Sequence, residues 1–556
     1  MVFDRHFAVW PARLPKSLDY PQVSLWEFLE TSARRYPDKP AIIYYGTRLS
    51  YRQLKEEAER VAAALAARGI EKGARVALYM QNAPQFVIAF YGILRANAMA
   101  VPLNPMLLEE ELAYMLQDSG ASVIFAGQDL AERVMAVKDR LPDLAVVTVT
   151  YRDYVPDEPE VPAPEFVRMP ARTVPGTVPW REFLAAGTDV PPLRVGPDDW
   201  AVLPYTSGST GMPKGCIHTH STVIATVISG AYWTNIAPSA VSLSVLPLFH
   251  VTGLQHCMNT PIFAGATIVL LSRWDRDTAA LCIEKYRCTH WVNISTMVVD
   301  FLANPNLDRY DISSLVSISG GGAPLPEAVG RRLYEKLGLR YVEGYGMTET
   351  ISQTHMNPPD RPKLQCLGVP VPDTDCRVLE LGTDRELGPG EEGEIVVHGP
   401  QVMKGYWNKP EETAKAFVTI DGKRFLRTGD IGRYDEEGYF FLVDRAKRMI
   451  NAAGFKVWPT EVETILYRHP AVEEACVVAT PDERRGENVK AYVVLREAYR
   501  GKVTPEEIIE WSKGQMAAYK YPRVVELVDA LPKSGSGKIL WRVLQDREFG
   551  RHAGSR

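Results

Sequence analysis

The sequence predicts an α/β protein with a large N-terminal domain of layered βα subdomains and a small, mobile α+β C-terminal domain. The first observation is that helical periodicity alternates with short apolar runs between residues 50 and 126. Repeated βα units of this kind form mostly parallel sheets covered by helices. The second is that the pattern changes after residue 443, so we expect domains at 1–443 and 444–556 with a hinge near 444–447. With 556 residues, of which 46% are hydrophobic, the chain can bury a large core.

The first helix of this alternating region is expected to begin after Ser50. Leu54, Ala58 and Val61 then fall on one face, and Gly69 stops the helix. The same reasoning gives the following strands and helices in chain order: strand 76–80, helix 85–94, strand 98–101, helix 109–116 and strand 123–126. The segment 153–179 is too rich in proline to continue regular structure, so it is expected to be a surface excursion.

The C-terminal region begins with a charged segment at 444–448 and a loop at 451–455. Pro459 suits the first turn of a helix. Strands are expected at 475–479 and 489–495, and Thr504 with Glu507 forms the capping-box start of a second helix.

Composition excludes several classes of protein. The formal net charge is −5 with 24% charged residues, so no basic field favours nucleic acid as a partner. The N-terminus does not resemble a signal peptide, and no run approaches the roughly 20 apolar residues that span a bilayer. We therefore expect a cytoplasmic protein without an integral membrane span. The cysteines are seven in number, scattered and never spaced C-x-x-C, which predicts reduced, buried thiols.

The segment YTSGSTGMPKG at 205–215 follows the apolar residues 201–204 and combines hydroxyls, glycines and a lysine. Glycines allow close backbone approach, hydroxyl and N–H groups donate to phosphate oxygens, and Lys214 supplies a cation. A polyphosphate is the expected ligand. The segment is not a Walker A loop, because Pro213-Lys214-Gly215 stands where Gly-Lys-Ser/Thr is required.

This segment resembles the signature of the adenylate-forming superfamily, which includes acyl-CoA synthetases, luciferases and peptide-synthetase adenylation domains. Further blocks resemble that family's motifs in the same order: GGGAPL at 320–325, GYGMTE at 344–349, RTGD at 427–430, DRAK at 444–447 and PKSGSGK at 532–538. The resemblance covers about residues 25–543 and is greatest to the acyl-CoA synthetase (fatty acid:CoA ligase) branch.

The resemblance implies a nucleotide site built from most of these blocks. Tyr345 would stack on adenine, Asp430 would accept both ribose hydroxyls, and Thr348 would contact the α-phosphate. Glu349 would hold Mg²⁺, a cation that prefers carboxylate and phosphate oxygens. The other residues implied to bind the nucleotide are Thr206, Ser207, Gly208, Ser209, Thr210, Lys214, Gly322, Ala323, Pro324, Gly344 and Arg445.

By the same resemblance, Lys538 bridges the carboxylate and the α-phosphate in the first step and leaves when the small domain rotates. Lys447 matches the hinge position. The loop of Gly454, Phe455 and Lys456 matches the segment that lines the thiol tunnel in the second position.

His250 resembles a family residue that stands between the acyl carboxylate and the incoming thiol. The acyl pocket is expected to involve Trp233, Val251, Asn293, Thr296 and Met297. For these residues, packing in an apolar core is nearly as good an interpretation. The chain departs from its relatives at Leu364-Gln-Cys366, where a small pair is common, and this leaves the local pocket shape open.

The sequence therefore predicts an ATP-dependent acid:CoA ligase that makes acyl-AMP and pyrophosphate, then acyl-CoA and AMP. ATP, Mg²⁺ and coenzyme A are the expected cofactor and co-substrates, and a medium- or long-chain fatty acid is the preferred substrate. Aryl or short-chain acids stay open, as does an acyl-AMP ligase that loads a carrier protein. A homodimer also stays open.

Overall fold

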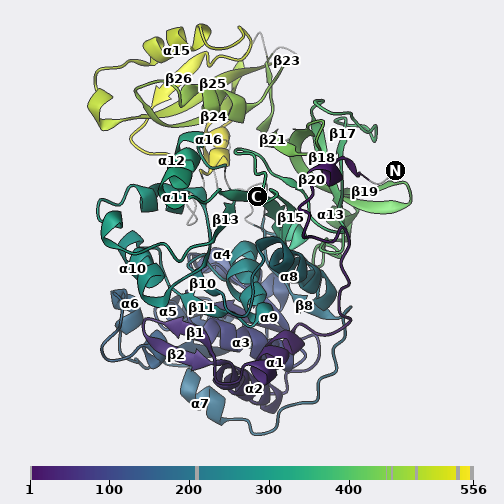
Figure 1. Cartoon of the computed structure of the whole chain (residues 1–556), viewed down its shortest axis with the longest axis vertical. Coiled ribbons are helices and arrows are strands. Elements are labelled where there is room, and N and C mark those ends of the chain that lie inside the picture. The colour runs from purple at the N-terminus through teal and green to yellow at the C-terminus, as the bar shows by residue number, and fades with distance from the viewer. Residues whose placement is uncertain are drawn as a thin grey trace.

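The computed structural model describes residues 3–206, 212–322, 324–445, 448–452, 455–482, 486–533 and 539–550. Figure 1 shows a large body of sheets and helices, with a smaller C-terminal unit at one end and α1–α3 at the opposite end. The predicted fold class is confirmed: a large N-terminal part of mixed sheets and helices is followed by a smaller α+β part.

A seven-stranded, mostly parallel sheet has the order β7-β6-β5-β3-β4-β8-β9. Its strands are β3 (Arg75–Tyr79), β4 (Met99–Pro102), β5 (Val123–Gly127), β6 (Ala145–Val149), β7 (Val178–Pro179), β8 (Trp200–Val202) and β9 (His218–Thr219). The predicted strands at 76–80, 98–101 and 123–126 correspond to β3, β4 and β5. Buried residues along these strands explain the continuous apolar runs.

The nine-stranded sheet has the order β16-β15-β14-β13-β12-β10-β11-β1-β2. Its strands are β1 (Pro40–Tyr44), β2 (Thr47–Ser50), β10 (Val241–Ser244), β11 (Thr267–Leu270), β12 (His290–Asn293), β13 (Ser317–Gly321), β14 (Val342–Met347), β15 (Ser352–Met356) and β16 (Val369–Pro370). The pairs from β1 through β11, β10, β12 and β13 to β14 are parallel, whereas β2, β15 and β16 pair antiparallel at the two edges.

Helices cover these sheets. They are α1 (Trp26–Arg35), α2 (Tyr51–Ala67), α3 (Pro84–Arg95), α4 (Glu109–Ser119), α5 (Ala131–Ala136), α6 (Glu165–Arg168), α7 (Trp180–Ala185), α8 (His220–Thr234), α9 (Thr260–Ala264), α10 (Arg276–Tyr286), α11 (Ser295–Leu302) and α12 (Glu327–Leu337). The expected start after Ser50 is confirmed, since the Ser50 side chain accepts from the Gln53 N–H in a capping box. A π-helix, η4 (Gly253–Asn259), precedes α9.

The proline-rich segment is less irregular than expected. Within 153–179 the chain forms α6 and ends in β7, which pairs with β6 at the sheet edge. Val161, Val167 and Val174 are buried. The prolines keep these elements short, as their missing N–H groups require, but the valines between them anchor the segment to the body.

A five-stranded antiparallel sheet follows, in which β17-β18-β20-β19 are neighbours and β21 pairs with β20. The strands are β17 (Asp375–Leu379), β18 (Gly393–His398), β19 (Phe417–Ile420), β20 (Lys423–Tyr434) and β21 (Phe440–Arg445), with α13 (Pro410–Lys415) before β19. Arg377 is 2% exposed and is held by Asp375 at 2.8 Å and Glu386 at 2.6 Å, so this buried charge is paired.

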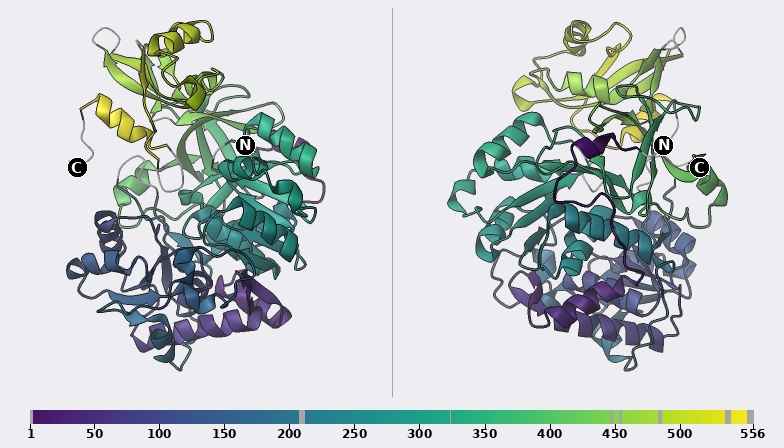
Figure 2. Two further views of the ribbon diagram at one scale, coloured as in Figure 1. Left: turned by 90° about the vertical axis from the view of Figure 1, so that its left-hand side faces the viewer. Right: turned by 45° about the vertical axis from the view of Figure 1, so that its right-hand side comes forward.

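The C-terminal unit contains a sheet of order β23-β22-β25-β24, with β26 parallel to β25. Its elements are β22 (Ile450–Ala452), β23 (Phe455–Val457), α14 (Pro459–Leu466), β24 (Val472–Asp482), β25 (Gly486–Leu495), α15 (Pro505–Lys513), β26 (Val524–Leu527) and α16 (Trp541–Glu548). The expected capping box at Thr504 is confirmed. Figure 2 shows this unit at the same end of the molecule from two further sides.

The start of the chain ties two layers together. Trp10 packs edge-on against Trp233 of α8 at 5.2 Å, while Phe3 packs against Tyr434 and Phe440 of the five-stranded sheet at 5.0 and 5.3 Å. Asp373 accepts hydrogen bonds from Ser17, Leu18 and Tyr20. Residues far apart in sequence are thereby joined at the side of the body.

All seven cysteines are buried and free, as predicted. Among the described residues, no helix is long and apolar enough to cross a membrane.

Candidate active site

Strand β13 runs into a glycine segment at the carboxyl end of the nine-stranded sheet. A Cβ atom at Gly320 would lie 2.2 Å from both the Asn293 carbonyl oxygen and the Tyr341 hydroxyl, so no side chain fits there. Gly322 has φ of +83°, in the left-handed region that favours glycine. In the sheet register Gly321 lies opposite Gly344, which brings the blocks at 320–325 and 344–349 side by side.

The turn between β14 and β15 carries Thr348 and Glu349. Its backbone is tight, because a Cβ atom at Gly346 would lie 1.7 Å from the Ser352 carbonyl oxygen. His218 Nε2 lies 2.8 Å from the Thr348 carbonyl oxygen. Burial lowers the pKa of His218 to about 4, so the ring is neutral and Nε2 can donate to that carbonyl. A neutral histidine therefore holds the turn through the Thr348 backbone carbonyl.

Tyr345 and Asp430 meet although 85 residues separate them: the Tyr345 hydroxyl donates to Asp430 Oδ2 at 2.6 Å. Asp430 is 1% exposed and lies on β20. The Asp430 N–H donates to Thr428 Oγ1 at 3.1 Å. The Tyr345 ring lies against His355, with ring centroids 5.6 Å apart. The predicted base-stacking tyrosine and the predicted ribose acid thus stand next to each other.

Lys214 and Glu349 are joined through Tyr406. The Lys214 ammonium lies 4.2 Å from the centre of the Tyr406 ring and 3.2 Å from Glu412 Oε2. The Tyr406 hydroxyl donates to Glu349 Oε1 at 2.9 Å. This arrangement places a cation beside the carboxylate predicted to hold magnesium, with an aromatic ring as the spacer.

The ends of the predicted phosphate loop are closed by backbone pairing. The Thr206 N–H donates to the Lys214 carbonyl at 2.9 Å, and the Lys214 N–H donates to Thr206 Oγ1 at 3.1 Å. Tyr205 and Gly215 also form a β-bridge. Eight predicted site residues lie outside the described residues: Ser207, Gly208, Ser209, Thr210, Ala323, Lys447, Gly454 and Lys538.

Three further predicted residues, Arg445, Phe455 and Lys456, lie on described strands, but their side chains lie outside the described atoms. The backbone of Arg445 stands opposite Asp430 in the pairing of β20 with β21. The backbones of Phe455 and Lys456 belong to β23.

The residues predicted for the acyl side are more dispersed. His250 is exposed on the segment between β10 and η4, and its Nδ1 accepts the Thr252 N–H at 3.3 Å. Val251 is buried beside it, and Met297 on α11 packs against the main core. Asn293, at the end of β12, accepts the Tyr341 hydroxyl at 2.9 Å. Thr296 is exposed on α11.

Trp233 is fully buried, and its contacts are structural. Its indole N–H donates to the Asn357 carbonyl at 2.8 Å, and its ring meets Trp10. It shares a small apolar cluster with Val342 and Met356. These contacts favour the core interpretation that the sequence left open.

A narrow internal cavity of about 10 Å³ lies between the nine-stranded sheet and the helices α8, η4 and α9. Such a volume holds about one water molecule. Most of its lining side chains are polar: Thr234, Ser242, His256, Thr260, His290, Ser317 and Ser319. Ser319 is the residue before Gly320, so one wall of the cavity continues into the glycine segment.

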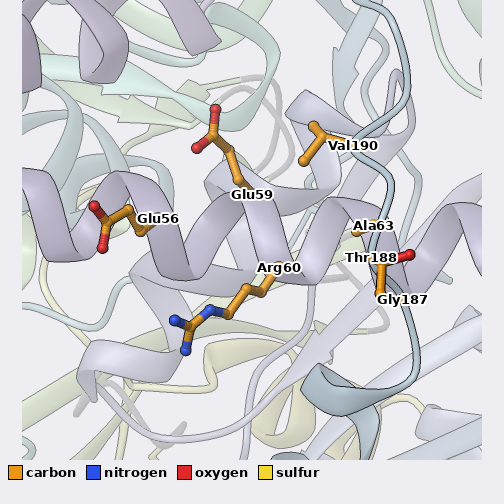
Figure 3. Close-up of a pocket in the computed structure, with 7 residues that line it drawn as sticks. All are labelled: Glu56, Glu59, Arg60, Ala63, Gly187, Thr188 and Val190. Atoms are coloured by element: carbon orange, nitrogen blue, oxygen red, sulfur yellow. The ribbon is translucent and has the colours of Figure 1, made fainter.

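A larger cavity, of about 250 Å³, opens on α2 and contains none of the predicted site residues. Figure 3 shows Glu56, Glu59 and Arg60 along the helix and Thr188 and Val190 on a segment that passes beside it. Gly187 is required there, since a Cβ atom would lie 2.3 Å from the Ala63 backbone.

Comparisons with known proteins show the family. Residues 29–407 match the family described as "AMP-binding enzyme", and residues 461–538 match "AMP-binding enzyme C-terminal domain". The chain is 37% identical over 555 residues to a long-chain-fatty-acid–CoA ligase of Bacillus subtilis, covering 98% of each chain.

The chain belongs to the adenylate-forming acyl-CoA synthetase family of AMP-binding enzymes.

A second relative of this synthetase family is a feruloyl-CoA synthase of Amycolatopsis, 36% identical over 524 residues, covering 93% of this chain and 97% of the relative. Among solved structures, ATP-bound MatB from Rhodopseudomonas palustris superposes with a TM-score of 0.83 at 27% identity, covering 95% and 99% of the two chains. The family and the enzyme class predicted from the sequence are confirmed.

A family of AMP-binding enzymes implies a nucleotide cofactor, and the described residues fit one. The Tyr345–Asp430 pair offers a ring and a carboxylate acceptor, and Lys214 offers a cation. For magnesium, Glu349 is a single half-buried carboxylate, and no group of three metal-binding side chains occurs among the described residues. One carboxylate fits Mg²⁺, which usually takes its other ligands from phosphates and water.

Sequence reasoning missed residues that position this synthetase site. Tyr406 gave no sign of its contact with Glu349, 57 residues earlier. His218 was not assigned to the site, although its ring contacts the Thr348 carbonyl oxygen. Glu343 offered a signal that was not used, because an acidic residue inside the apolar strand β14 needs donors for its carboxylate.

Proposed function

We propose that the protein activates a medium- or long-chain fatty acid as its acyl adenylate and transfers the acyl group to coenzyme A. In the first step a carboxylate oxygen attacks the α-phosphorus of ATP, and the bond to pyrophosphate breaks. In the second step the thiol of coenzyme A attacks the acyl carbonyl, AMP leaves and the thiol proton is released. The observation that carries this proposal is that the segment 344–349 contacts two others: Tyr345 binds Asp430, and Glu349 is joined through Tyr406 to Lys214.

In this proposal the Tyr345–Asp430 pair binds the nucleoside. The Tyr345 ring stacks on adenine, with Gly322, Ala323, Pro324 and Gly344 beside it. The Asp430 carboxylate accepts the ribose hydroxyls. Its tie to the Tyr345 hydroxyl at 2.6 Å sets the ring and the carboxylate in one fixed relation before the nucleotide arrives, which lowers the entropic cost of binding.

The phosphates bind between the loop at 205–215 and the turn at Thr348. Thr206 to Thr210 donate to phosphate oxygens and Lys214 offsets their charge, while Thr348 donates to the α-phosphate. Magnesium, held by Glu349, would neutralise charge on the phosphates when bound. Because donors are fixed before reaction, little reorganisation is needed as charge builds on the α-phosphate.

The domain closure remains a proposal: residues 444–556 act as a lid on residues 1–443, hinged near 444–447. Lys538 contacts the reacting carboxylate and α-phosphate in one position, and Gly454, Phe455 and Lys456 line the thiol path in the other. Arg445 lies near the ribose, and Lys447 lies at the hinge. At the junction the Thr460 N–H donates to Asp444 Oδ2 at 2.7 Å, so the strand that ends at the hinge is tied to α14.

The acyl group is proposed to lie beside His250, with Val251, Asn293 and Met297 along it and with Trp233 supporting the pocket from the core. The relatives named long-chain-fatty-acid–CoA ligases support a fatty acid. A cytoplasmic location and a homodimer remain predictions.

A second candidate is a hydroxylated aryl acid. The observation that favours it is the polar lining of the cavity behind η4, where serine, threonine and histidine side chains would satisfy a ring hydroxyl better than an alkyl end. The feruloyl-CoA synthase relative agrees with this choice.

The deciding experiment is a pyrophosphate-release screen with saturated acids of graded length and with hydroxycinnamic acids, each with and without coenzyme A. A fatty-acid ligase gives the highest kcat/KM for a medium or long chain, together with AMP formation that depends on coenzyme A. Preference for a hydroxycinnamic acid would move the assignment to the second candidate. Pyrophosphate release without AMP formation that depends on coenzyme A would instead indicate an acyl-AMP ligase that loads a carrier protein.

A further inference from the structure

Glu343 on β14 is a buried carboxylate that the proposed reaction does not use. It is 5% exposed, and its Oε1 accepts the Leu325 N–H at 3.1 Å and the Gln365 N–H at 3.2 Å. In the sheet register Glu343 stands opposite Gly320, so the carboxylate lies beside the glycine segment. A single oxygen thus joins two loops that are 40 residues apart, from 325 to 365.

The first of these loops is the proposed adenine-binding segment, which includes Gly322, Pro324 and Leu325. The second is the segment at 364–366. Leu364 packs on α12, since a Cβ atom at Gly330 would lie 2.8 Å from its Cδ1. The Glu343 carboxylate therefore binds both loops, the first through Leu325 and the second through Gln365.

Backbone strain in the second loop points to the same role. Gln365 has φ of +56°, a conformation that costs free energy for a residue other than glycine. The Gln365 side chain is exposed, so the hydrogen bond from the Gln365 N–H to Glu343 is the contact that offsets the cost of this backbone conformation. Such strain persists where the surroundings determine the conformation.

The second loop also contacts the strand that leads to the proposed hinge. The Asn357 side chain donates to the Cys366 carbonyl at 2.9 Å, and the Cys366 thiol donates to the Phe440 carbonyl at 3.2 Å. Phe440 begins β21, whose other end stands opposite Asp430. The adenine-binding segment is therefore linked through Glu343 to the strand beside the ribose acid.

From these contacts we infer that Glu343 is a positioning residue for ATP: its carboxylate fixes the segment 322–325 against the loop 364–366 and thereby sets the affinity for the nucleotide. This inference rests on the proposed function. A neutral amide would fill the same space, so what the carboxylate adds when charged is stronger hydrogen bonds from the two N–H groups. The role is one of orientation, because among the described residues the Glu343 carboxylate contacts backbone N–H groups and none of the proposed reacting groups.

Glu343 is expected to titrate near neutral pH, because it is buried and none of the described groups around it holds it charged. Burial raises its pKa to about 7, partly offset by the N–H donors. Of the groups that face it, Tyr341 and Cys366 have raised pKa values and stay neutral. His355, on β15, has its pKa lowered to about 3. Lys363 is occupied by Asp435 at 2.6 Å and Glu437 at 2.8 Å.

The test compares Glu343→Gln with the unchanged protein by calorimetric titration of magnesium ATP at pH 8 and pH 6, with no acid present. At pH 8 the unchanged protein holds the charged carboxylate, so the variant should bind about 3- to 10-fold more weakly, the difference between charged and neutral hydrogen bonds. At pH 6 both side chains are neutral and the ratio of the two Kd values should approach one. The ratio of the two Kd values at one pH cancels the effect of ATP protonation, which is the same for both proteins.

Two further variants make the outcome decisive. Glu343→Ala removes the acceptor altogether and should weaken binding more than Glu343→Gln at both pH values. Glu57→Gln alters a half-buried carboxyl of raised pKa on α2, outside the proposed nucleotide site, and should leave Kd unchanged. A Kd ratio for Glu343→Gln that stays the same at both pH values, or equals one at pH 8, overturns the inference while ATP binding still stands. Failure of the unchanged protein to bind ATP would instead remove the proposed function and this inference with it.

Discussion

In the proposed function Tyr345 makes two separable contributions to nucleotide binding, a ring face and a hydroxyl that donates to Asp430. Tyr345→Phe keeps the ring and removes the hydrogen bond at 2.6 Å, so we expect KM for ATP to rise by about 3- to 10-fold. Tyr345→Ala also removes the stacking, which is worth about 1–3 kcal/mol for a base on an aromatic ring. Steady-state kinetics of pyrophosphate release measures both. Equal effects of the two variants would show that the ring does not contact the base.

Glu343 is also expected to cost stability. Its pKa in the folded protein, about 7, is raised above the ordinary value of 4.5, so the native state binds the proton more tightly. Its stabilising contribution is fully present below about pH 4.5 and is lost as the pH rises through about 7. Glu343→Gln should therefore have a higher Tm than the unchanged protein at pH 8 and a similar Tm at pH 5, as measured by calorimetric melting.

A lower Tm for Glu343→Gln at pH 8 would mean that the charged hydrogen bonds outweigh the cost of burying the carboxylate. Proteins often give up stability at residues that orient a ligand. The expected combination of higher Tm and weaker ATP binding is the signature that separates positioning from a purely structural role.

At the residue scale, the sequence predicted residues of the candidate site but did not predict which residues they contact. The motif residues Tyr345 and Asp430 were predicted from the resemblance, and the structure brings them into contact. Tyr406 and His218 were missed, because the contacts that matter are made to a carboxylate and a backbone carbonyl 57 and 130 residues away. Hydrogen bonds across such separations leave no periodic pattern in a sequence.

Among the elements, the π-helix η4 depends on one glycine. A Cβ atom at Gly253 would lie 2.1 Å from the Pro247 carbonyl oxygen and 3.0 Å from the Leu246 carbonyl oxygen, both backbone atoms with little freedom to move. Gly253→Ala should therefore cost about 1–3 kcal/mol of stability, the usual range for overpacking. Because η4 borders the segment that carries His250, acid activation should fall as well.

The matched control for this glycine is Gly196→Ala, since no heavy atom lies within 4 Å of the added Cβ at that position. Urea denaturation of both variants gives the comparison. If Gly253→Ala is as stable as Gly196→Ala, the close approach at the start of η4 has no energetic weight.

The helices and strands of the βα region were largely predictable, whereas η4 was not. Strands β3, β4 and β5 are buried on both faces and appear as continuous apolar runs, and α2 is marked by its capping box. A π-helix differs from an α-helix by one extra residue per hydrogen-bonded ring, and the apolar pattern of seven residues cannot distinguish them. The segment 153–179 was called an excursion because prolines dominate it, although the valines between them are buried.

At the scale of the molecule, six buried histidines among the described residues link stability to acid. Burial lowers the pKa of His290 below its ordinary value, that of His6, His218, His220 and His256 to about 4 and that of His355 to about 3. These values lie below the ordinary 6.5, so the unfolded chain takes up protons first as the pH falls. The contribution of each histidine other than His290 is fully present above about pH 6.5 and is lost as the pH falls toward about 4, by about 1 kcal/mol by pH 5.5.

The expected result is a marked fall in Tm between pH 7.5 and pH 5.5. In His220→Asn, the side-chain oxygen can accept the Leu25 N–H that now donates to His220 Nδ1 at 3.0 Å. The fall in Tm should be smaller in this variant, because one group that takes up a proton on unfolding has been removed. An unchanged pH dependence in this variant would show that His220 is not the group that takes up the proton.

The proposed domain closure predicts that one substitution affects the two reaction steps differently. If residues 444–556 form a lid that carries Lys538, Lys538→Ala should slow adenylate formation by about 100-fold or more, the scale for losing one fixed charge-stabilising donor. Thioester formation from supplied acyl-AMP should be nearly unchanged. Single-turnover measurements of the two steps test this, and equal loss in both would contradict a two-position mechanism.

The overall division into a large and a small part could be predicted from the change of pattern after residue 443, because each part has its own apolar core. The way the first residues tie the α8 layer to the five-stranded sheet could not. It depends on rings that meet across more than 200 residues, such as Trp10 and Trp233.

Those first residues are connected to the proposed nucleotide site by a series of ring contacts. Phe3 meets Phe440 at 5.3 Å, Phe440 meets His355 at 4.6 Å, and His355 meets Tyr345 at 5.6 Å. Removing the first residues would therefore uncover Phe440 and loosen the support behind the ring that is proposed to stack on adenine. We expect proteolytic cleavage just after Phe3 to weaken ATP binding, although no residue proposed to bind ATP is removed.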